Sequence, residues 1–249
     1  YSDKGLSRFL DMTPELMTLL GFHLAEGSCS SRGGIRLAMG KRNEAVLPEM
    51  IAAFSRVFGE APHVYRSANR VGELRLVHRV AALAWQHVFG YRHAFSETKR
   101  VPDIVFAAPV PLRLAFLRGY FLGDGTLGRR ALSFTTASRE LASGIQYLLS
   151  SLGVTASLSR RDPDGVVRRI RGKPCQTRHA VWTLSVSARD DLGRLAVVWV
   201  DHASAPRLRT ACSGSRPGAR RRMEDIGGDL MALPITSISR VEASSGKVY

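Results

Sequence analysis

Two acidic residues, Glu26 and Asp124, each stand before a glycine at the end of an apolar segment, 19–27 or 117–125. Two carboxylates that lie side by side repel each other unless they are protonated or bridged by cations. Mg²⁺ prefers carboxylate and water oxygens, and it can stabilise both the attacking and the leaving oxygen of a phosphodiester. We therefore predict that Glu26 and Asp124 bind metal for phosphodiester hydrolysis if the fold brings them together.

Small residues inside the two segments favour such a meeting. Gly21 with Ala25, and Gly119 with Gly123, are spaced four apart, so each pair shares one face of a helix. Loss of side-chain bulk there lets two helices approach more closely than the usual separation of about 8 to 10 Å. One acid-Gly match could be merely a polar helix end, but two matched copies favour a helix interface built on these four residues.

The elements around the two segments are also repeated. Each segment follows a helix-start signal, Thr13-Pro14-Glu15 or Pro109-Val110-Pro111, and is expected to end at its glycine. Apolar periodicity and turn residues then predict hairpins over 28–39 and 126–135, helices over 44–58 and 138–152, strand pairs 63–66 with 73–77 and 154–161 with 180–187, and closing helices over 79–89 and 188–198. The sequence thus predicts an α+β fold of two αββαββα halves, related by a pseudo-twofold axis, with two antiparallel sheets.

This repeat also sets the expected boundaries. They are a first half over 1–101, a Pro-rich linker over 102–110, a second half over 111–200, and a C-terminal segment over 201–249 that departs from the plan. Within that segment, 213–222 has the composition of a basic linker, and 235–241 could form one more strand.

The charge balance indicates an anionic partner. Among 249 residues, 45% of them hydrophobic, 36 Lys and Arg stand against 21 Asp and Glu, a net charge of +15. The sequence contains no membrane-spanning run, lipidation signal or basic amphipathic helix, which favours nucleic acid over a membrane and predicts an intracellular protein, cytoplasmic or nucleoid-associated. Cys29, Cys175 and Cys212 are too widely separated to predict structural zinc or a disulfide framework.

Arginines on the predicted strands and hairpins are candidates for DNA contacts. Strand residues spaced by two face one way, and arginine can bind guanine bidentately, whereas phosphate contacts only set position. The sequence does not sort the two roles. The candidates from both halves are Arg36, Arg66, Arg75, Arg129, Arg130, Arg160, Arg161, Arg168, Arg169 and Arg171.

The two segments and their flanking elements resemble the LAGLIDADG homing endonucleases, in their monomeric two-motif form found inside inteins, over about residues 12–199. The resemblance implies that the motif helices form the interface between halves, that the eighth motif residues Glu26 and Asp124 hold the metals, and that the sheets form a saddle over the major groove. It further implies an enzyme: a site-specific hydrolase that cuts both strands of a long, asymmetric double-stranded DNA target as a monomer. Mg²⁺ is the expected cofactor, with Mn²⁺ able to substitute and Ca²⁺ non-catalytic.

Two further features bear on the resemblance. Where the family name reads Ile-Asp, the first motif has His23 and Leu24, and the second has Leu122. His23 is expected to pack in the interior rather than act as a base. Lys99-Arg100-Val101-Pro102 is similar to the family's Lys-x-apolar-Pro block, which implies that Lys99 lies near the metals and positions or polarises the attacking water. By pseudo-symmetry a second catalytic lysine is expected late in the other half. Lys173 is the candidate, with Arg171 or Arg178 as alternatives.

Other functions stay open at this point. A catalytically inactive relative could be a DNA-binding regulator or an RNA maturase, and a basic structural module is a third possibility, but retention of both acids favours catalysis. The segments 235–241 and 248–249 are similar to the approach to an intein's C-terminal splicing block. The chain is thus expected to be part of an intein precursor. Because no His-Asn terminus follows and Tyr1 is not a splicing nucleophile, we expect that this chain does not splice by itself.

Overall fold

The computed structural model describes residues 5–67, 70–91, 95–170, 172–202, 204–213, 224–227, 230–232, 235 and 237–240. Three sequence predictions fall outside the described residues: the basic linker over 214–222, the DNA contact of Arg171, and the approach to a splicing block over 241–249.

Each half of the chain begins with one of the two motif helices. The first half contains α1 (Pro14–Glu26), β1 (Gly27–Ser30), β2 (Gly34–Met39), α2 (Leu47–Phe58), β3 (His63–Ser67), β4 (Arg70–Leu76) and α3 (Arg79–His87). A short α4 (Asp103–Phe106) follows. The second half contains α5 (Val110–Asp124), β5 (Gly125–Leu127), β6 (Leu132–Thr136), α6 (Arg139–Ser151), β7 (Ser157–Arg161), β8 (Val167–Ile170), β9 (Lys173–Gln176), β10 (Val181–Val186), α7 (Arg189–Arg194) and α8 (Ala196–Trp199).

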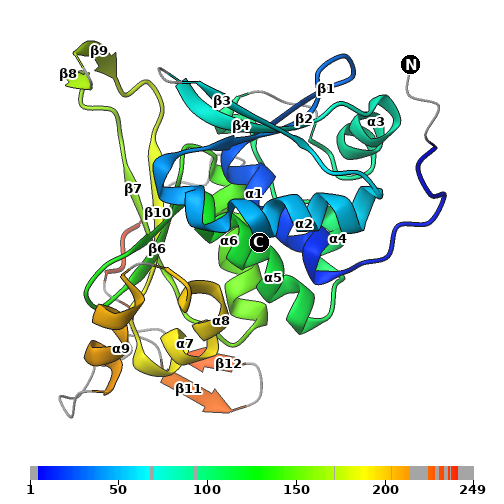
Figure 1. Cartoon of the computed structure of the whole chain (residues 1–249). Coiled ribbons are helices and arrows are strands. Elements are labelled where there is room, and N and C mark those ends of the chain that lie inside the picture. The colour runs from blue at the N-terminus through cyan, green and yellow to red at the C-terminus, as the bar shows by residue number, and fades with distance from the viewer. Residues whose placement is uncertain are drawn as a thin grey trace.

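Each half contributes a four-stranded antiparallel sheet (Figure 1). The strand order is β1-β2-β4-β3 in one sheet and β5-β6-β10-β7 in the other, so the hairpin after each motif helix pairs with the later strands in the same way. Figure 1 shows the first sheet at the top and the second along the left. Helices α1, α2, α5 and α6 lie below the first sheet and to the right of the second. The predicted α+β fold with two antiparallel sheets is confirmed.

The core lies between the sheets and the helices. In β2, Ile35 and Leu37 are fully buried while Arg36 between them faces the other way, as strand alternation requires. Helix α1 is buried from Leu16 to Ala25, which fits a helix enclosed by packing on several sides. Within the described ranges, no helix has the length and apolarity that a bilayer crossing needs.

Several boundaries differ from the predicted ones. The helix expected over 44–58 begins only at Leu47, after a 3₁₀ helix (Lys41–Val46), because Pro48 is tolerated only in a first turn. The strand expected from residue 154 begins at Ser157. The closing helix expected over 188–198 is divided into α7 and α8. The expected linker contains α4 and packs against the core through Val105.

Later parts of the chain depart further from the prediction. A hairpin of β8 and β9 lies in the connection between β7 and β10, and we call residues 162–180 the arm. Helix α9 (Ala205–Ser213) and a small sheet of β11 (Glu224–Gly227) and β12 (Leu230–Ala232) were not predicted. The strand predicted over 235–241 is wrong where it is described, because 235 and 237–240 are exposed and have no strand partner to satisfy their backbone groups.

Candidate active site

The motif helices α1 and α5 pack backbone against backbone. A β-carbon added to Gly21 would lie 2.0 Å from the carbonyl oxygen of Phe116, and one added to Gly119 would lie 2.1 Å from that of Thr18. The contacts are reciprocal, as expected for two helices related by a pseudo-twofold axis. No side chain larger than hydrogen fits at either position without moving a helix.

Small residues also meet at the C-terminal ends of these helices. A β-carbon on Gly123 would lie 2.3 Å from the β-carbon of Ala25 and 3.0 Å from Cγ of Glu26. Helix α1 ends at Glu26 and α5 ends at Asp124, so the close approach continues to the last residue of each helix. The fold therefore brings the two acids to one place.

The glycine after each acid does not end its helix in the left-handed conformation. Gly27 has φ −97° and Gly125 has φ −78°, so both are extended and lead directly into β1 and β5. A β-carbon at Gly27 would lie 2.3 Å from the His23 ring, and one at Gly125 would lie 2.0 Å from the Phe121 ring. A side chain at either glycine would collide with this ring. Each helix therefore ends at a glycine because a ring packs there, and not because the glycine takes the left-handed conformation expected of a helix cap.

The two carboxylates are close enough to influence each other. Burial raises the pKa of the Asp124 carboxyl from 3.8 to about 6, with Lys99 opposing the change and Glu26 adding to it. Burial also raises the pKa of Glu26, again opposed by Lys99. Both residues keep a solvent-accessible part, Glu26 being half-buried and Asp124 more exposed. Solvent can therefore reach both carboxyl groups, and ionising both of them at once is unfavourable.

Lys99 carries a positive charge that acts on both carboxylates. Its Nζ donates a hydrogen bond of 3.0 Å to the carbonyl oxygen of Ala25, in the last turn of α1. Burial lowers the pKa of the Lys99 amine, while Asp124 and Glu26 oppose that change. The backbone of Lys99 is held by the other half of the chain, since Ser138 Oγ donates 2.6 Å to the Lys99 carbonyl oxygen.

Ser138 is a residue of this site that the sequence analysis placed only at a helix start. Its hydroxyl also accepts from the N–H of Leu141 at 3.1 Å, so the fully buried side chain caps α6 while it holds Lys99. The cap is readable from the sequence as a serine before a helical pattern. The bond from the same hydroxyl to Lys99 cannot be read from the sequence, because Ser138 and Lys99 come from different halves.

His23 lies beneath the acid end of α1. It is 4% exposed, its ring centroid lies 4.6 Å from that of Tyr91 and 5.6 Å from that of Trp85, and its Nδ1 has no hydrogen-bond partner. Burial, helped by Lys99, lowers the pKa of His23 to about 3. The imidazole is therefore neutral and packs as a ring, like Phe121 at the same place of the second motif.

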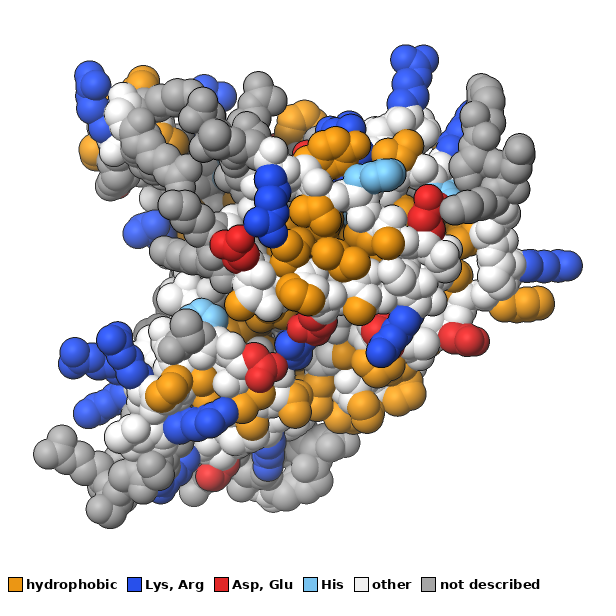
Figure 2. Space-filling model, viewed as in Figure 1, with side chains coloured by type: hydrophobic (Ala, Val, Ile, Leu, Met, Phe, Trp, Pro, Cys, Tyr) orange, Lys and Arg blue, Asp and Glu red, His pale blue; other side chains and the backbone are white. Residues whose placement is uncertain are grey.

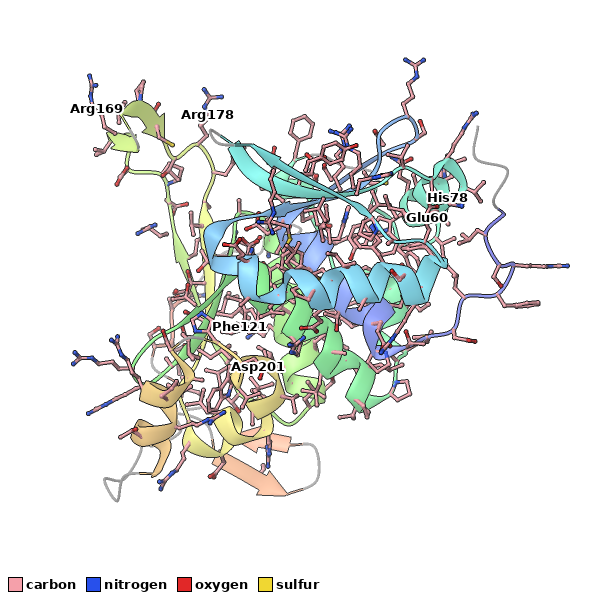
Figure 3. The ribbon with its side chains drawn as sticks, viewed as in Figure 1. Glu60, His78, Phe121, Arg169, Arg178 and Asp201 are labelled. Carbon is pink, nitrogen blue, oxygen red and sulfur yellow. The ribbon has the colours of Figure 1, made fainter. Side chains whose placement is uncertain are left out.

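Lys173 lies on β9, in the arm rather than at the helix ends. Figure 3 shows Arg169 and Arg178 at the outer end of the arm, well away from Phe121 in α5. The described backbone of β8 and β9 forms a separate two-stranded sheet, and the side chains of Lys173 and Arg168 lie outside the described set. The structure brings together Glu26, Asp124 and Lys99, but it does not bring the strand of Lys173 to them.

Two candidate arginines of the first sheet, Arg36 and Arg75, share its open face. Arg36 on β2 is paired across the sheet with Arg75 on β4. The Arg75 guanidinium donates to Glu73 at 2.9 Å and lies 5.1 Å from the centre of the Tyr65 ring. Arg66 on β3 is within 3.6 Å of Glu44. The open face of this sheet is therefore charged and aromatic.

The second sheet has a different open face. Hydroxyl side chains occupy it, with Thr135 and Thr183 within 3.5 Å of each other. Arg160 and Arg161 on β7 fall on opposite faces, and Arg160 lies over the Trp182 ring, 5.6 Å from its centre. These two arginines therefore do not share a surface. Arg129 and Arg130 are exposed in the turn between β5 and β6.

The donor set fits hard divalent cations. Two oxygen-donor carboxylates converge, and Glu26 adds to the rise in the pKa of Asp124. A cation between the two would lower the cost of ionising them. Across the described parts of the chain, no group of three or more His, Cys, Asp and Glu side chains is gathered. Cations bound between Glu26 and Asp124 would therefore need water, backbone or substrate oxygens as their remaining ligands.

Comparison with known proteins links the second half to a family. Residues 111–196 match the model of a LAGLIDADG-like domain. Among solved structures, the chain is similar to I-DmoI in complex with DNA and Ca (TM-score 0.54, 15% identity, 80% of this chain and 99% of that one). It is also similar to I-DmoI in complex with DNA and Mn (TM-score 0.52, 15% identity, 77% and 99%). These likenesses show that the fold is that of the two-motif LAGLIDADG homing endonuclease structures.

Sequence relatives are segments of much longer proteins. The chain is 30% identical over 167 residues to a DNA polymerase of Thermococcus hydrothermalis, covering 64% of this chain and 9% of that protein. It is 31% identical over 153 residues to a component of the A-type ATP synthase of Methanopyrus kandleri (59% and 14%). It is 27% identical over 151 residues to a component of the DNA gyrase of Mycobacterium kansasii (57% and 26%). The chain thus spans about a tenth to a quarter of the length of these relatives.

Proposed function

We propose that this chain is a site-specific, metal-dependent DNA endonuclease of the homing type. The observation that carries the proposal is the convergence of Glu26 and Asp124 at the ends of two packed helices, with Lys99 beside them. Because one chain supplies both halves of the site, the enzyme acts as a monomer. The fold it shares with I-DmoI, solved with DNA and Mg, Mn or Ca, supports the same substrate and cofactor class.

Glu26 and Asp124 would hold Mg²⁺, which supplies Lewis-acid stabilisation of the oxygens attached to the reacting phosphorus. In the hydrolysis, water adds to phosphorus and one P–O bond to a sugar breaks, leaving a phosphate monoester and a hydroxyl. The two acids orient the reacting groups and are ionised when metal is bound. The same chemistry accepts Mn²⁺, whereas Ca²⁺ is expected to support binding without cutting.

Lys99 would act beside the two acids. Its amine is anchored at the Ala25 carbonyl oxygen, and its charge lies near both carboxylates. From this position an ammonium group can hold the attacking water or offset charge that develops on phosphate oxygens. His23 has no such role, because its ring is buried and neutral beneath the site.

The open faces of the two sheets are the proposed DNA interface. Strands fit the major groove, and their outward residues can reach base edges. Figure 2 shows a face on which apolar side chains gather over α2 and α5, while Lys and Arg lie mainly at its margins. This face is a poor match for DNA, which supports placing the DNA against the sheets. The charged first face and the hydroxyl-bearing second face would read unlike half-sites, so the target would be asymmetric.

The arm extends the basic surface of the second half. The arm contains five Lys and Arg against two Asp, a net charge of +3. The exposed Arg169 and Arg178 point outward from its far end in Figure 3. In the first half β3 ends at Ser67 and β4 begins at Arg70, so that half has no comparable extension. We infer that the arm contacts phosphates beyond the second sheet.

The relatives support an intein as the source of the chain. A polymerase, a gyrase and an ATP synthase perform unrelated tasks, yet each contains a segment similar to this chain. An element inserted into different host genes accounts for this distribution, and a homing endonuclease is the activity that spreads such an element. We therefore propose that the chain is part of an intein precursor.

Cleavage of a randomised-site plasmid library tests the proposal. Wild-type protein with Mg²⁺ is expected to cut a subset of plasmids, and Glu26→Gln and Asp124→Asn are each expected to lower the rate at least on the order of 10²-fold. Ca²⁺ in place of Mg²⁺ gives the non-catalytic control, in which all three proteins should still shift the selected DNA. Undiminished cutting by either variant would falsify the assigned roles.

A different outcome favours the second function that the sequence left open. Specific gel shift by the wild-type protein, with no cutting in Mg²⁺ or Mn²⁺, would identify a DNA-binding regulator with an inactive site. Shift of RNA in preference to the DNA library would instead identify a maturase.

A further inference from the structure

A pocket of about 760 Å³ lies between the β1–β2 turn and the start of α3. It is lined by Ser31, Arg32 and Gly34 of the turn and by residues 77–80. Gly34 has φ +75°, and a β-carbon there would lie 2.0 Å from the Leu76 carbonyl oxygen, so the turn packs closely against the end of β4. Figure 3 shows His78 at the α3 end of the first sheet, well away from Phe121 and from the arm. The pocket is therefore separate from the site at the ends of the motif helices.

His78 is a buried side chain with one unused hydrogen-bonding atom in this pocket. It is 3% exposed, and its Nδ1 accepts from the N–H of Ala81 at 3.2 Å, which caps α3. An Nδ1 that accepts carries no hydrogen, so in the neutral ring the hydrogen is on Nε2. Among the described residues, Nε2 has no acceptor. A buried donor without a partner costs free energy, which favours a ligand that accepts a hydrogen bond there.

The first turn of α3 supplies two more donors. The Ala82 N–H donates to the His78 carbonyl oxygen at 2.9 Å, but the N–H groups of Arg79 and Val80 have no acceptor in the described parts of the chain. The helix dipole adds positive potential there, and the side chains of Arg32 and Arg79 add two charges. No acidic residue of the described ranges lines the pocket. Donors and positive charge are therefore gathered where the described chain supplies no anion of its own.

The corresponding helix of the second half has its own acids. Helix α7 begins Arg189-Asp190-Asp191, whereas α3 begins Arg79-Val80-Ala81 and has no acid in its first turn. Asp191 is fully buried and accepts from the Thr155 N–H at 3.3 Å. An arginine in a first turn is unfavourable beside the helix dipole unless a negative charge offsets it. The start of α3 therefore lacks a negative charge that the start of α7 has.

We propose that this pocket binds one phosphate of the DNA backbone, through His78 Nε2, the first N–H groups of α3 and the guanidinium groups of Arg32 and Arg79. The inference rests on the proposed endonuclease function. Val77 is 50% exposed and Val80 is 52% exposed, and such apolar side chains fit the deoxyribose on either side of a backbone phosphate. This favours a DNA phosphate over a free one.

The pocket is also continuous with the face proposed to bind DNA. Arg36 shares the open face of the first sheet with Arg75. A β-carbon on Gly33 would lie 2.2 Å from Nη2 of Arg36, so this arginine packs against the same β1–β2 turn that lines the pocket. A DNA strand that crosses the open face can therefore reach the pocket at the turn end of the sheet.

Titration of the metal-free protein with inorganic phosphate tests the pocket without DNA. At about pH 8, where an ordinary histidine is neutral, and at constant ionic strength, the ¹H–¹³C ring signals of His78 are expected to shift to saturation. Their absence from His78→Asn identifies them, and asparagine keeps a cap for α3. Arg79→Gln is expected to weaken phosphate binding on the order of 10-fold, and Arg189→Gln, at the matched place in α7, to leave it unchanged. A His78 signal that does not move, or that responds equally in Arg79→Gln, would overturn the proposal.

Ethylation interference on a site selected in the library assay, in Ca²⁺, tests whether the phosphate belongs to DNA. Ethylation removes the charge of one phosphate at a time. At one position in the half-site of the first sheet, it is expected to lower the affinity of the wild-type protein on the order of 10-fold, but not that of a protein with both Arg32→Gln and Arg79→Gln. The salt slope of this double variant should be smaller by about one, and Arg189→Gln should keep the wild-type slope. Phosphate binding without such a position would overturn DNA as the ligand and assign the pocket to free phosphate.

Failure of this inference and failure of the proposed function give different results. A wild-type protein that neither binds nor cuts the library DNA disproves the endonuclease function and the DNA contact with it, even if inorganic phosphate binds. A protein that cuts DNA, and whose ethylation pattern and salt slope are unchanged in the double variant, keeps the function and loses only the phosphate contact.

Discussion

Ser138 Oγ and the Lys99 carbonyl oxygen are joined by a hydrogen bond of 2.6 Å between the two halves of the chain. The same hydroxyl caps α6 by accepting from Leu141. A buried serine of the second half therefore fixes the backbone of the lysine that serves Glu26 and Asp124. The site depends on both halves for this cation as well as for its acids.

Replacing Ser138 is expected to release Lys99. Ser138→Gly removes the donor but costs the helix cap only a few tenths of a kcal/mol, because glycine is tolerated at an N-cap. We expect slower cleavage with little loss of thermal stability, and faster reductive methylation of Lys99 in the metal-free protein, measured by peptide mass spectrometry. Ser138→Thr keeps the hydroxyl and is the matched control. If Lys99 in the glycine variant stays as protected as in the threonine variant, Ser138 does not hold it.

The glycine seam between α1 and α5 is expected to tolerate no methyl group. Gly21→Ala would place a β-carbon 2.0 Å from a backbone oxygen of the other helix. Forcing the helices apart is expected to cost about 3 kcal/mol. Gly193→Ala is the control, since a β-carbon in that part of α7 has nothing within 4 Å. It should stabilise by about 0.5 to 1 kcal/mol, as alanine does over glycine in a helix. Urea unfolding of both variants measures the difference, and similar midpoints would contradict the close packing.

The metal-free protein is expected to lose stability as pH rises past the pKa of Asp124. The folded-state pKa of about 6 lies above the ordinary value of 3.8, so between them the folded state binds more protons than the unfolded state. Stability therefore falls through this window, and the ionised, partly desolvated carboxylate of Asp124 opposes folding fully above it. Asp124→Asn should raise the melting temperature in EDTA at about pH 8 and change it little near pH 4.

Divalent metal should reverse this difference. At about pH 8, Ca²⁺ is expected to raise the melting temperature of the wild-type protein through binding to the folded state, and to raise that of Asp124→Asn less. Thermal melts with and without Ca²⁺ measure both effects. An equal gain for the two proteins would place the binding of Ca²⁺ elsewhere.

The buried imidazole of His23 is expected to be replaceable by a phenyl ring. His23→Phe removes a buried Nδ1 that has no partner, and it reproduces the ring found at Phe121 in the second motif. Removing such an atom should raise the free energy of unfolding by about 1 kcal/mol, with cleavage preserved. The reverse change, Phe121→His, should destabilise the protein. Loss of cleavage by a well-folded His23→Phe protein would show that the imidazole takes part in the chemistry.

DNA binding is expected to be strongly salt-dependent, with part of the dependence residing in the arm. Six to ten phosphate contacts would lower affinity by roughly 10³- to 10⁵-fold between about 50 and 200 mM salt. Changing Arg168, Arg169 and Arg171 to Gln should reduce the slope by up to about three, or roughly one for each phosphate that an arginine no longer neutralises. Arg56→Gln is the control, because Arg56 on α2 is paired with Glu15 at the opposite end of the seam. A slope unaltered by the arm changes would remove the arm from the interface.

The sequence alone determined the repeat, the α+β class with its two sheets, and the motif glycines and acids as a linked set. These follow from local signals, namely the periods of helices and strands, helix-start residues and small residues four apart, which each half carries within a short stretch. Even there, local signals misplaced some ends. The helix that ends at Phe58 starts at Leu47 because Pro48 limits it. Ile235 and Ile238 are not in a strand, and no strand of the described residues pairs with them.

Tertiary structure alone decided which residues complete the site and which do not. Ser138 and Lys99 are 39 positions apart, and Tyr91 donates to the Leu20 carbonyl oxygen across 71 positions, so no periodicity links them. Lys173 fits a place in the sequence plan but belongs to a hairpin that forms a separate two-stranded sheet among the described residues. A spacing along the chain specifies which residues share a face of one element. Whether faces of different elements meet depends on how the helices and sheets pack, which is a property of the whole fold.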